Sequence, residues 1–354
     1  MTSSTLYPLL LERKIVQPIW GGERLAAWLE LPEPRPTQLG ETWQVYDTNP
    51  ILNGPLAGQT LAQATQQLGA QLVGTRTIER YGRDFPLLAK FIDANDKLSI
   101  QVHPTDDYAH SHEAATGFHG KTEAWYILDA QPGANVIYGL ERQSNQAEFA
   151  AAVENGNLEP LMHYMPVSAG DIIFVPAGTL HAINAGIVLF EIQEKSDLTY
   201  RVYDYGRRDA KTGKQRELHL EKALDVTEFA PPPRSKIEPL AMGDDRTLLI
   251  ACSYFALERW QVSDELTLAT NPGTFEILTL LEGQGTLQGG GESVALRRGD
   301  SVVLPAALGN YTLRPNGGAI HMLRAYVPDL ERDLATPLRA RGINPDRIAE
   351  VVVQ

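Results

Sequence analysis

Apolar and polar positions alternate with a period of two over many short segments of the chain, separated by turns rich in glycine and proline. Residues 98–103 and 254–262 show this alternation, while 85–92, 188–192 and 274–282 are more continuously apolar, as in buried strands. Such alternation predicts β-strands. A helical period appears only at residues 60–80, with Thr60 as the expected N-cap, and in an insert at about 141–165, with Ser144 expected to cap a helix over 146–154. We therefore expect a mainly β protein with a helical N-terminal segment and a helical insert.

One stretch of sequence occurs twice. Residues 169–176 and 298–305 share a Gly-Asp pair, a run of mostly apolar positions and a closing proline. Such self-similarity indicates a duplicated module. The second copy has the neighbourhood of Asn310 where the first has His181, so we expect the chemistry in the first copy. The expected domains are 1–228, a proline-rich linker at 229–236 and 237–354, because consecutive prolines disfavour helix and sheet.

Composition narrows the class of protein. The 354 residues include 43% hydrophobic and 21% charged residues, which is typical of a globular chain. No apolar run is long enough to span a membrane, and no signal peptide is expected. A formal net charge of −13 argues against nucleic-acid binding, which favours a basic face. Cys252, the single cysteine, excludes an intramolecular disulfide and a thiolate metal cage, so we expect a cytoplasmic protein.

Three segments together predict a metal site. In an extended strand Gln101 and His103 share one face, and Glu123 lies on a second strand. His181 follows a turn that contains Pro176 and Gly178. Two imidazoles, a carboxylate and an amide suit zinc with an open coordination position, and manganese, iron or cobalt also fit these ligands. The alternative is that the two histidines are hydrogen-bonded core residues.

Three further histidines lie close together at residues 106–120. They are His110, His112 and His119. We favour a helical turn capped near Thr105, with solvated side chains, over a metal site.

The motifs around these ligands resemble a known family. Gly170-x5-Pro176-x-Gly178-x2-His181-x2-Asn184 resembles the second cupin motif, with one residue fewer than usual before the asparagine. Residues 98–104 (LSIQVHP), 120–125 (GKTEAW) and 175–182 (VPAGTLHA) are similar to the cupin-type (type I) mannose-6-phosphate isomerases. Residues 18–21 (PIWG) and 40–43 (GETW) extend the likeness over nearly the whole chain. It is closest to the short bacterial form.

The resemblance implies two cupin-like jelly-roll barrels and a reversible aldose–ketose isomerisation of D-mannose 6-phosphate to D-fructose 6-phosphate through an enediol or enediolate. It implies one Zn²⁺ per chain, or another divalent metal, with Gln101, His103, Glu123 and His181 as the ligands. Arg201 matches the family's catalytic arginine and Lys121 a pocket lysine. The permanent charge of Arg201 suits an electrostatic clamp, and either Lys121 or Glu194 could shuttle the proton.

The substrate contacts are less sharply defined by sequence. Ser99 and Lys97, together with Lys90 and Arg201, are candidates for binding phosphate because they lie near the motif. Trp20 is expected either to line the sugar site or to fill the core. Alternatives are an isomerase of unphosphorylated mannose or of glucose 6-phosphate, and a non-enzymatic sugar-binding protein with two cupin modules. We expect neither nucleic acid nor membrane as a partner, and the oligomeric state is left open.

Overall fold

The computed structural model describes residues 6–208, 212–232 and 236–353, and the chain divides into two compact units. Unit 1 comprises Met1–Lys14, Trp43–Ala89 and Glu238–Gln354, and unit 2 comprises Ile15–Thr42 and Lys90–Ile237. The division expected from sequence was contiguous, whereas each of these units contains separated segments. Residues 233–235 of the expected linker lie outside the described residues.

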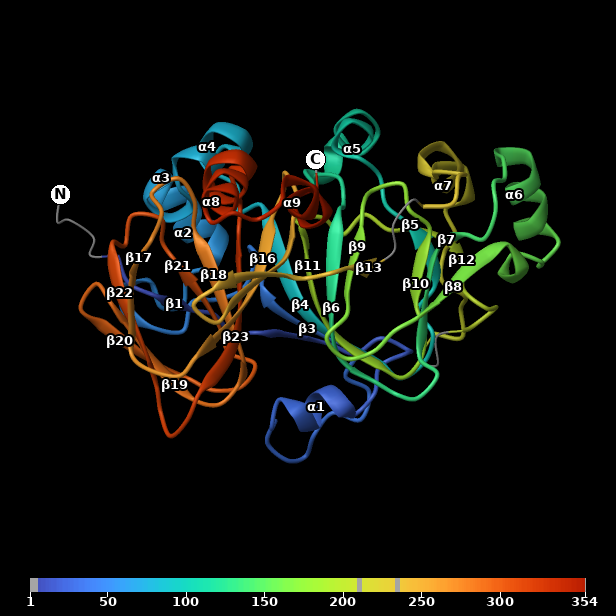
Figure 1. The fold of residues 1–354 in the computed structure, drawn as a ribbon. Helices are drawn as coiled ribbons and strands as arrows, with labels where there is room; N and C mark the ends of the chain where they lie inside the picture. Colours follow the sequence, from blue (N-terminus) through green and yellow to red (C-terminus); the bar gives the residue numbers. More distant parts are fainter. Residues whose placement is uncertain (1–5, 209–211, 233–235, 354) are drawn as a thin grey trace. The chain divides into compact units, whose positions relative to one another are not determined.

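Unit 2 contains a five-stranded sheet and most of a seven-stranded sheet (Figure 1). The five-stranded sheet has the order β12 (Tyr200–Tyr203), β5 (Ile100–Val102), β10 (His181–Ile183), β7 (Asn135–Leu140) and β8 (Met162–Pro166). The seven-stranded sheet has the order β13 (Lys236–Ile237), β9 (Ile172–Val175), β6 (Glu123–Ala130), β11 (Ile187–Glu194), β4 (Leu87–Ala94), β3 (Glu41–Val45) and β2 (Lys14–Val16).

The alternation of side chains gives the five-stranded sheet two different faces. Ile100 and Val102 belong to an apolar cluster with Phe149 and Ala223, which lie on α6 (Gln146–Glu154) and α7 (Leu220–Val226). Because successive strand residues point to opposite faces, this packing directs Gln101 towards the other sheet. The remaining helical elements of unit 2 are α1 (Arg24–Trp28), α5 (Asp106–His112), η2 (Ala114–Thr116) and η3 (Glu159–Leu161).

The cap of α6 differs from the expected one. The side chain of Asn145, not Ser144, accepts the hydrogen bond from the Glu148 backbone N–H. Ser144 Oγ instead donates to the Glu148 carboxylate at 2.7 Å. Both residue types are good N-caps, and the backbone at the start of the helix places Asn145 where the first free N–H groups point.

Unit 1 also contains two sheets. Its seven-stranded sheet has the order β1 (Leu9–Leu10), β21 (Ser301–Leu304), β18 (Glu276–Glu282), β23 (Ile320–Tyr326), β16 (Ala256–Val262), β15 (Arg246–Ala251) and β14 (Leu240–Gly243). Its four-stranded sheet has the order β17 (Leu266–Ala269), β22 (Asn310–Pro315), β19 (Gly285–Gly289) and β20 (Glu292–Leu296). Apolar side chains from both sheets, among them Trp260, Leu280, Leu287 and Leu313, form one core.

The helices of unit 1 lie near its two ends in sequence. They are η1 (Gly54–Leu56), α2 (Leu61–Leu68), α3 (Ala70–Val73), α4 (Thr75–Tyr81), the π-helical η4 (Leu330–Ala335), α8 (Thr336–Ala340) and α9 (Pro345–Val351). Thr60 caps α2 as predicted. Its side chain accepts from the Gln63 N–H, and the Gln63 side chain accepts from the Thr60 N–H, which completes a capping box. The mainly β prediction with a helical N-terminal segment is confirmed.

The predicted repeat is reproduced in the backbone hydrogen bonds of both copies. Gly170 N–H donates to Ile127 O at 2.8 Å, and Gly299 N–H donates to Leu280 O at 2.7 Å. The aspartate side chains that follow, Asp171 and Asp300, each accept a backbone N–H three residues upstream. Both glycines have positive φ, 92° and 80°, which explains why glycine stands there.

No helix in the described parts of the chain has the length and apolar character needed to cross a membrane.

Candidate metal centre

Sheet register aligns the predicted site residues of the five-stranded sheet. Gln101 of β5 lies opposite His181 of β10 on one side and opposite Arg201 of β12 on the other. His103 follows β5 directly. Glu123 begins β6 in the other sheet, where it lies opposite Val175 of β9. The ligands predicted from three segments therefore come from both sheets of unit 2.

The four side chains converge. Glu123 Oε2 lies 3.5 Å from His103 Nε2, and Glu123 Oε1 lies 3.4 Å from His181 Nε2. His103, Glu123 and His181 are each 1% exposed, and one donor atom from each falls within a group spanning at most 4.8 Å. The Gln101 amide nitrogen lies 3.3 Å from His181 Nε2, and a half-turn of the amide presents its oxygen at the same point.

Backbone carbonyls orient both imidazoles. His103 Nδ1 is 2.8 Å from Leu198 O, and His181 Nδ1 is 2.8 Å from Thr179 O. Because a carbonyl only accepts, each Nδ1 carries the proton and each Nε2 presents its lone pair to the centre. These carbonyls could not have been identified from residue types, since every residue has one.

The electrostatics favour the metal-binding protonation states. Burial lowers the pKa of His103 to about 3, with a further contribution from the charge of Lys121, and burial also lowers the pKa of His181. Burial alone would raise the pKa of the Glu123 carboxyl, but Lys121 and the histidines outweigh it and hold that pKa well below its usual range. The site thus offers two neutral imidazoles and an ionised carboxylate.

A divalent metal fits this donor set. Among the described residues no hydrogen bond of good geometry reaches the buried Glu123 Oε2, although Lys121 and His103 approach it. Lys121 already supplies one positive charge to this oxygen at 2.9 Å, so the fit to a metal rests on the donor set itself. Imidazole nitrogen with carboxylate and amide oxygen is a set that borderline divalent ions accept.

Lys121 and Arg201 flank the centre. Lys121 Nζ lies 2.9 Å from Glu123 Oε2 and 3.1 Å from His103 Nε2. Arg201 Nε donates to Ser99 Oγ at 3.3 Å, and its Nη1 donates to Glu217 O at 2.9 Å. Burial, reinforced by nearby Arg216, lowers the pKa of Arg201 from its usual value. The structure therefore brings Ser99, Lys121 and Arg201 beside the four ligands.

Other predicted residues have different surroundings. Trp20 is 3% exposed and packs with Trp125 in the apolar core, and its contact with the sugar stays a prediction. Lys90 is buried and ion-paired with Glu191 at 3.0 Å and with Glu41 at 3.6 Å, which removes it as a phosphate ligand. Lys97 is half-buried and lies over the Tyr205 ring. The buried Glu194 accepts the Thr122 N–H at 2.9 Å.

Three residues near Arg201 were not singled out from sequence. Asp204 pairs with both Arg207 and Arg216. Arg207 Nη1 also lies 3.2 Å from Asp96 Oδ2, near Lys97 in sequence. The density of basic and aromatic residues at 199–208 was the available signal, but it did not reveal that Asp204 holds two guanidinium groups in place.

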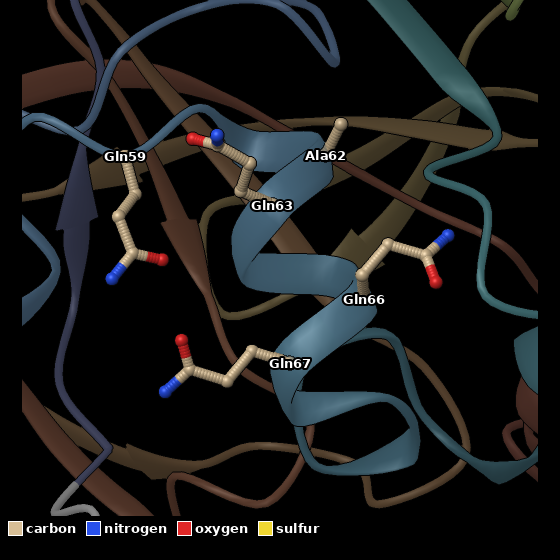
Figure 2. A pocket seen from close by; sticks show the side chains of 5 residues that line it. All are labelled: Gln59, Ala62, Gln63, Gln66 and Gln67. Atoms are coloured by element: carbon tan, nitrogen blue, oxygen red, sulfur yellow. The ribbon is translucent and has the colours of Figure 1, made fainter.

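A surface depression in unit 1 has no comparable chemistry. Figure 2 shows the side chains that line it: Ala62, Gln63, Gln66 and Gln67 of α2, and Gln59, two residues before the helix. Gln63 belongs to the capping box, and Gln66 donates to Arg83 O. These two glutamine side chains hold the local backbone in place. None of the five lining residues has a titratable or nucleophilic side chain.

Comparisons with known proteins agree with the geometry. The model of the phosphomannose isomerase type I catalytic domain matches residues 9–133, and that of the mannose-6-phosphate isomerase cupin domain matches residues 244–324. Mannose-6-phosphate isomerase ManA of Bacillus subtilis is 37% identical over 319 residues, which cover 87% of this chain and 96% of that protein. The mannose-6-phosphate isomerase of Streptococcus mutans is 37% identical over 303 residues, covering 84% and 92%.

Solved structures share the fold. The crystal structure of mannose 6-phosphate isomerase from Bacillus subtilis has a TM-score of 0.79 and 31% identity, covering 90% of this chain and 99% of that chain. A zinc-bound mannose 6-phosphate isomerase shares the fold at a TM-score of 0.72 and 17% identity, covering 92% and 100%. The predicted cupin jelly-roll class is confirmed. By its sequence and its fold, the chain belongs to the type I mannose-6-phosphate isomerases.

Proposed function

We propose that this chain interconverts D-mannose 6-phosphate and D-fructose 6-phosphate with one Zn²⁺ held by Gln101, His103, Glu123 and His181. The observation that carries the proposal is the convergence of two imidazole Nε2 atoms and the Glu123 carboxylate, with both tautomers set by backbone carbonyls. Zinc suits these ligands because it accepts nitrogen and oxygen donors and tolerates an open position. A zinc-bound protein of the same fold is consistent with that choice.

The reaction moves the proton on C2 of the aldose to C1, while a hydroxyl proton passes between the two adjacent oxygens. Negative charge develops on those oxygens in the enediol or enediolate. A bound divalent ion stabilises such charge as a Lewis acid. Arg201 supplies a fixed guanidinium that cannot act as a base and is anchored through Ser99 and Glu217 O. It therefore serves as an electrostatic clamp on the developing charge.

Lys121 is our candidate for carrying the proton. Its ammonium lies among the residues that would hold the metal, 2.9 Å from Glu123 Oε2, so it would be within reach of a substrate bound there. Glu194 is the alternative. One of its oxygens accepts the Thr122 N–H, which restricts its motion. We therefore favour Lys121 over Glu194 as the residue that carries the proton.

We place the phosphate near Lys97, Ser99 and Arg201. The substrate must be attracted against a formal net charge of −13, so local cations are required. Arg207 and Arg216 lie beside this group and pair with Asp204 and Asp96, so the positive charge offered to the phosphate comes from Lys97 and Arg201. Charge-assisted hydrogen bonds from such groups are the usual means of holding phosphate without a glycine-rich loop.

The test combines metal analysis with turnover. We expect purified protein to contain about one zinc per chain, to lose activity on chelation, and to regain it with zinc. Glu123→Gln should lose metal or turnover, whereas Glu154→Gln, at an exposed position, should retain both. Full activity in verified metal-free protein would refute the proposal. Equal efficiency with unphosphorylated mannose would instead contradict the phosphate site.

A cytoplasmic location is part of the same proposal. Its support is the single, buried Cys252, since an extracellular protein of this length more commonly uses disulfides.

A further inference from the structure

We propose that Asp106, His110 and His119 form a second divalent-metal site, separate from the four ligands described above. One donor atom from each of these three side chains lies within 4.8 Å of the other two. Asp106 and His110 belong to α5, and His119 lies on the connection from η2 to β6. The inference does not depend on the isomerase activity.

The spacing of the two imidazoles fits metal coordination. His110 Nε2 lies 3.1 Å from His119 Nδ1. Two nitrogens bound at tetrahedral angles to zinc, each at about 2.0–2.1 Å, are about 3.3 Å apart. Without an ion, one proton between these nitrogens makes the hydrogen bond. On binding, that proton moves to the other nitrogen of its ring, and both facing lone pairs are donated to the metal.

The two segments that carry these ligands are already held together. Gly120 N–H donates to Asp106 Oδ1 at 2.9 Å, and Lys121 N–H donates to Pro104 O at 3.0 Å. A Cβ at Gly120 would lie 2.5 Å from the Asp106 backbone nitrogen, so this position packs directly on the start of α5. These contacts already fix the backbone around Asp106 and Gly120 without an ion. Binding therefore costs little conformational entropy.

The capped helix presents the ligands on one side. The Thr105 side chain accepts from the Tyr108 N–H and caps α5, as expected from sequence. Asp106 and His110 are four residues apart and thus adjacent on the helix surface. His112 faces elsewhere, since its ring stacks on Tyr108 at 4.1 Å. The helix thereby separates one of the three clustered histidines from the other two.

The ligand chemistry defines the class of ion. Two imidazoles and one carboxylate suit zinc, cobalt, nickel or copper, whereas calcium and magnesium prefer oxygen donors alone. His110 is exposed, so water can complete the coordination and the ion can exchange with solvent. A bound ion would connect α5 to the segment that runs directly into Lys121 and Glu123.

The experiment measures metal stoichiometry in the full-length holoprotein. We would dialyse zinc-loaded protein against increasing free Co²⁺ or Zn²⁺ and determine the bound metal by elemental analysis. The wild type should gain a second ion per chain. His110→Ala and His119→Ala should each lose that second ion and keep the first. His112→Ala, on the same helix, should bind both.

Two further measurements keep the outcome unambiguous. Glu123→Gln should still take up the second ion, which separates failure at this site from failure at the main centre. The second ion should also raise the thermal midpoint of the wild type but not that of His110→Ala, whose exposed side chain can be removed without disturbing the core. The proposal is overturned if the wild type takes up no second ion, or if His110→Ala binds it as the wild type does.

Discussion

Glu276 of β18 occupies the same position in its sheet as Glu123 of β6. Glu123 lies opposite Val175, and Glu276 lies opposite Leu304. Each of these partners is the residue that precedes the proline of the repeated sequence. The repeat therefore places a buried carboxylate at the equivalent point of both units.

The surroundings of the two carboxylates differ. Glu123 faces two imidazoles, whereas Glu276 accepts hydrogen bonds from Arg324 Nε at 2.9 Å and Nη2 at 3.0 Å. Arg324 Nη1 also donates to Glu258 at 3.0 Å. A guanidinium has no lone pair for a metal. Unit 1 has thus kept the carboxylate and neutralises it with a cation of its own, in agreement with a second copy that lacks metal chemistry.

Replacing Arg324 by Met should strongly destabilise the protein, because Glu258 and Glu276 would remain buried without a cationic partner. Breaking a buried ion pair in this way costs about 3–5 kcal/mol. Arg314→Met, which removes an exposed pair with Glu265, should cost less than about 1 kcal/mol. Urea unfolding of both variants gives the comparison. Equal losses would show that the Arg324 pairs contribute no more than a surface bridge.

Arg201→Lys should lower kcat for D-mannose 6-phosphate on the order of a hundredfold, the usual effect of losing one oriented donor to developing charge. Lysine keeps the charge but cannot span Ser99 and Glu217 O with a planar fork. Steady-state kinetics with bound metal measured in each sample provides the test. Arg142→Lys, an exposed control, should behave as wild type. An unchanged kcat in Arg201→Lys would remove this residue from the reaction.

Asp204 should contribute to stability at neutral pH and lose that contribution in acid. Burial would raise the pKa of this carboxyl, but hydrogen bonds from Arg216 and Arg207 outweigh burial and lower it. A lowered folded-state pKa stabilises the protein above the unfolded value of about 3.9, and the contribution disappears as pH falls through the folded-state pKa.

The measurement for Asp204 is urea unfolding of Asp204→Asn at pH 7 and at about pH 3. The variant should be less stable than wild type at pH 7, and the difference should shrink at the lower pH. Asp264→Asn, at an exposed position, should change little at either pH. A difference that grows in acid would contradict the assigned direction.

Thr60→Ala should reduce the free energy of unfolding by about 1 kcal/mol, the usual cost of losing an N-cap. Thr60→Ser keeps the hydroxyl that accepts from the Gln63 N–H and should remain close to wild type. Chemical denaturation distinguishes the two. Similar losses in both variants would indicate that the methyl group, not the cap, matters at this position.

Local sequence patterns were sufficient to predict the fold class and much of the candidate metal site. Alternation of apolar residues, turn glycines and the capping residue at Thr60 act over a few neighbouring positions, so they are visible in the sequence. The same alternation put Gln101 and His103 on one face of a strand. The repeat around Gly170 and Gly299 likewise predicted a duplicated β module.

Only the tertiary structure decided which distant groups meet. Lys90 was a candidate for binding phosphate, yet the fold pairs it with Glu191 in the interior. His110 and His119 resembled solvated residues of a helical turn, yet the packing of Gly120 on α5 brings them together. The carbonyls that orient the two ligand imidazoles are also a product of chain path. Residue type determines what a side chain can donate or accept, but its partners depend on long-range packing.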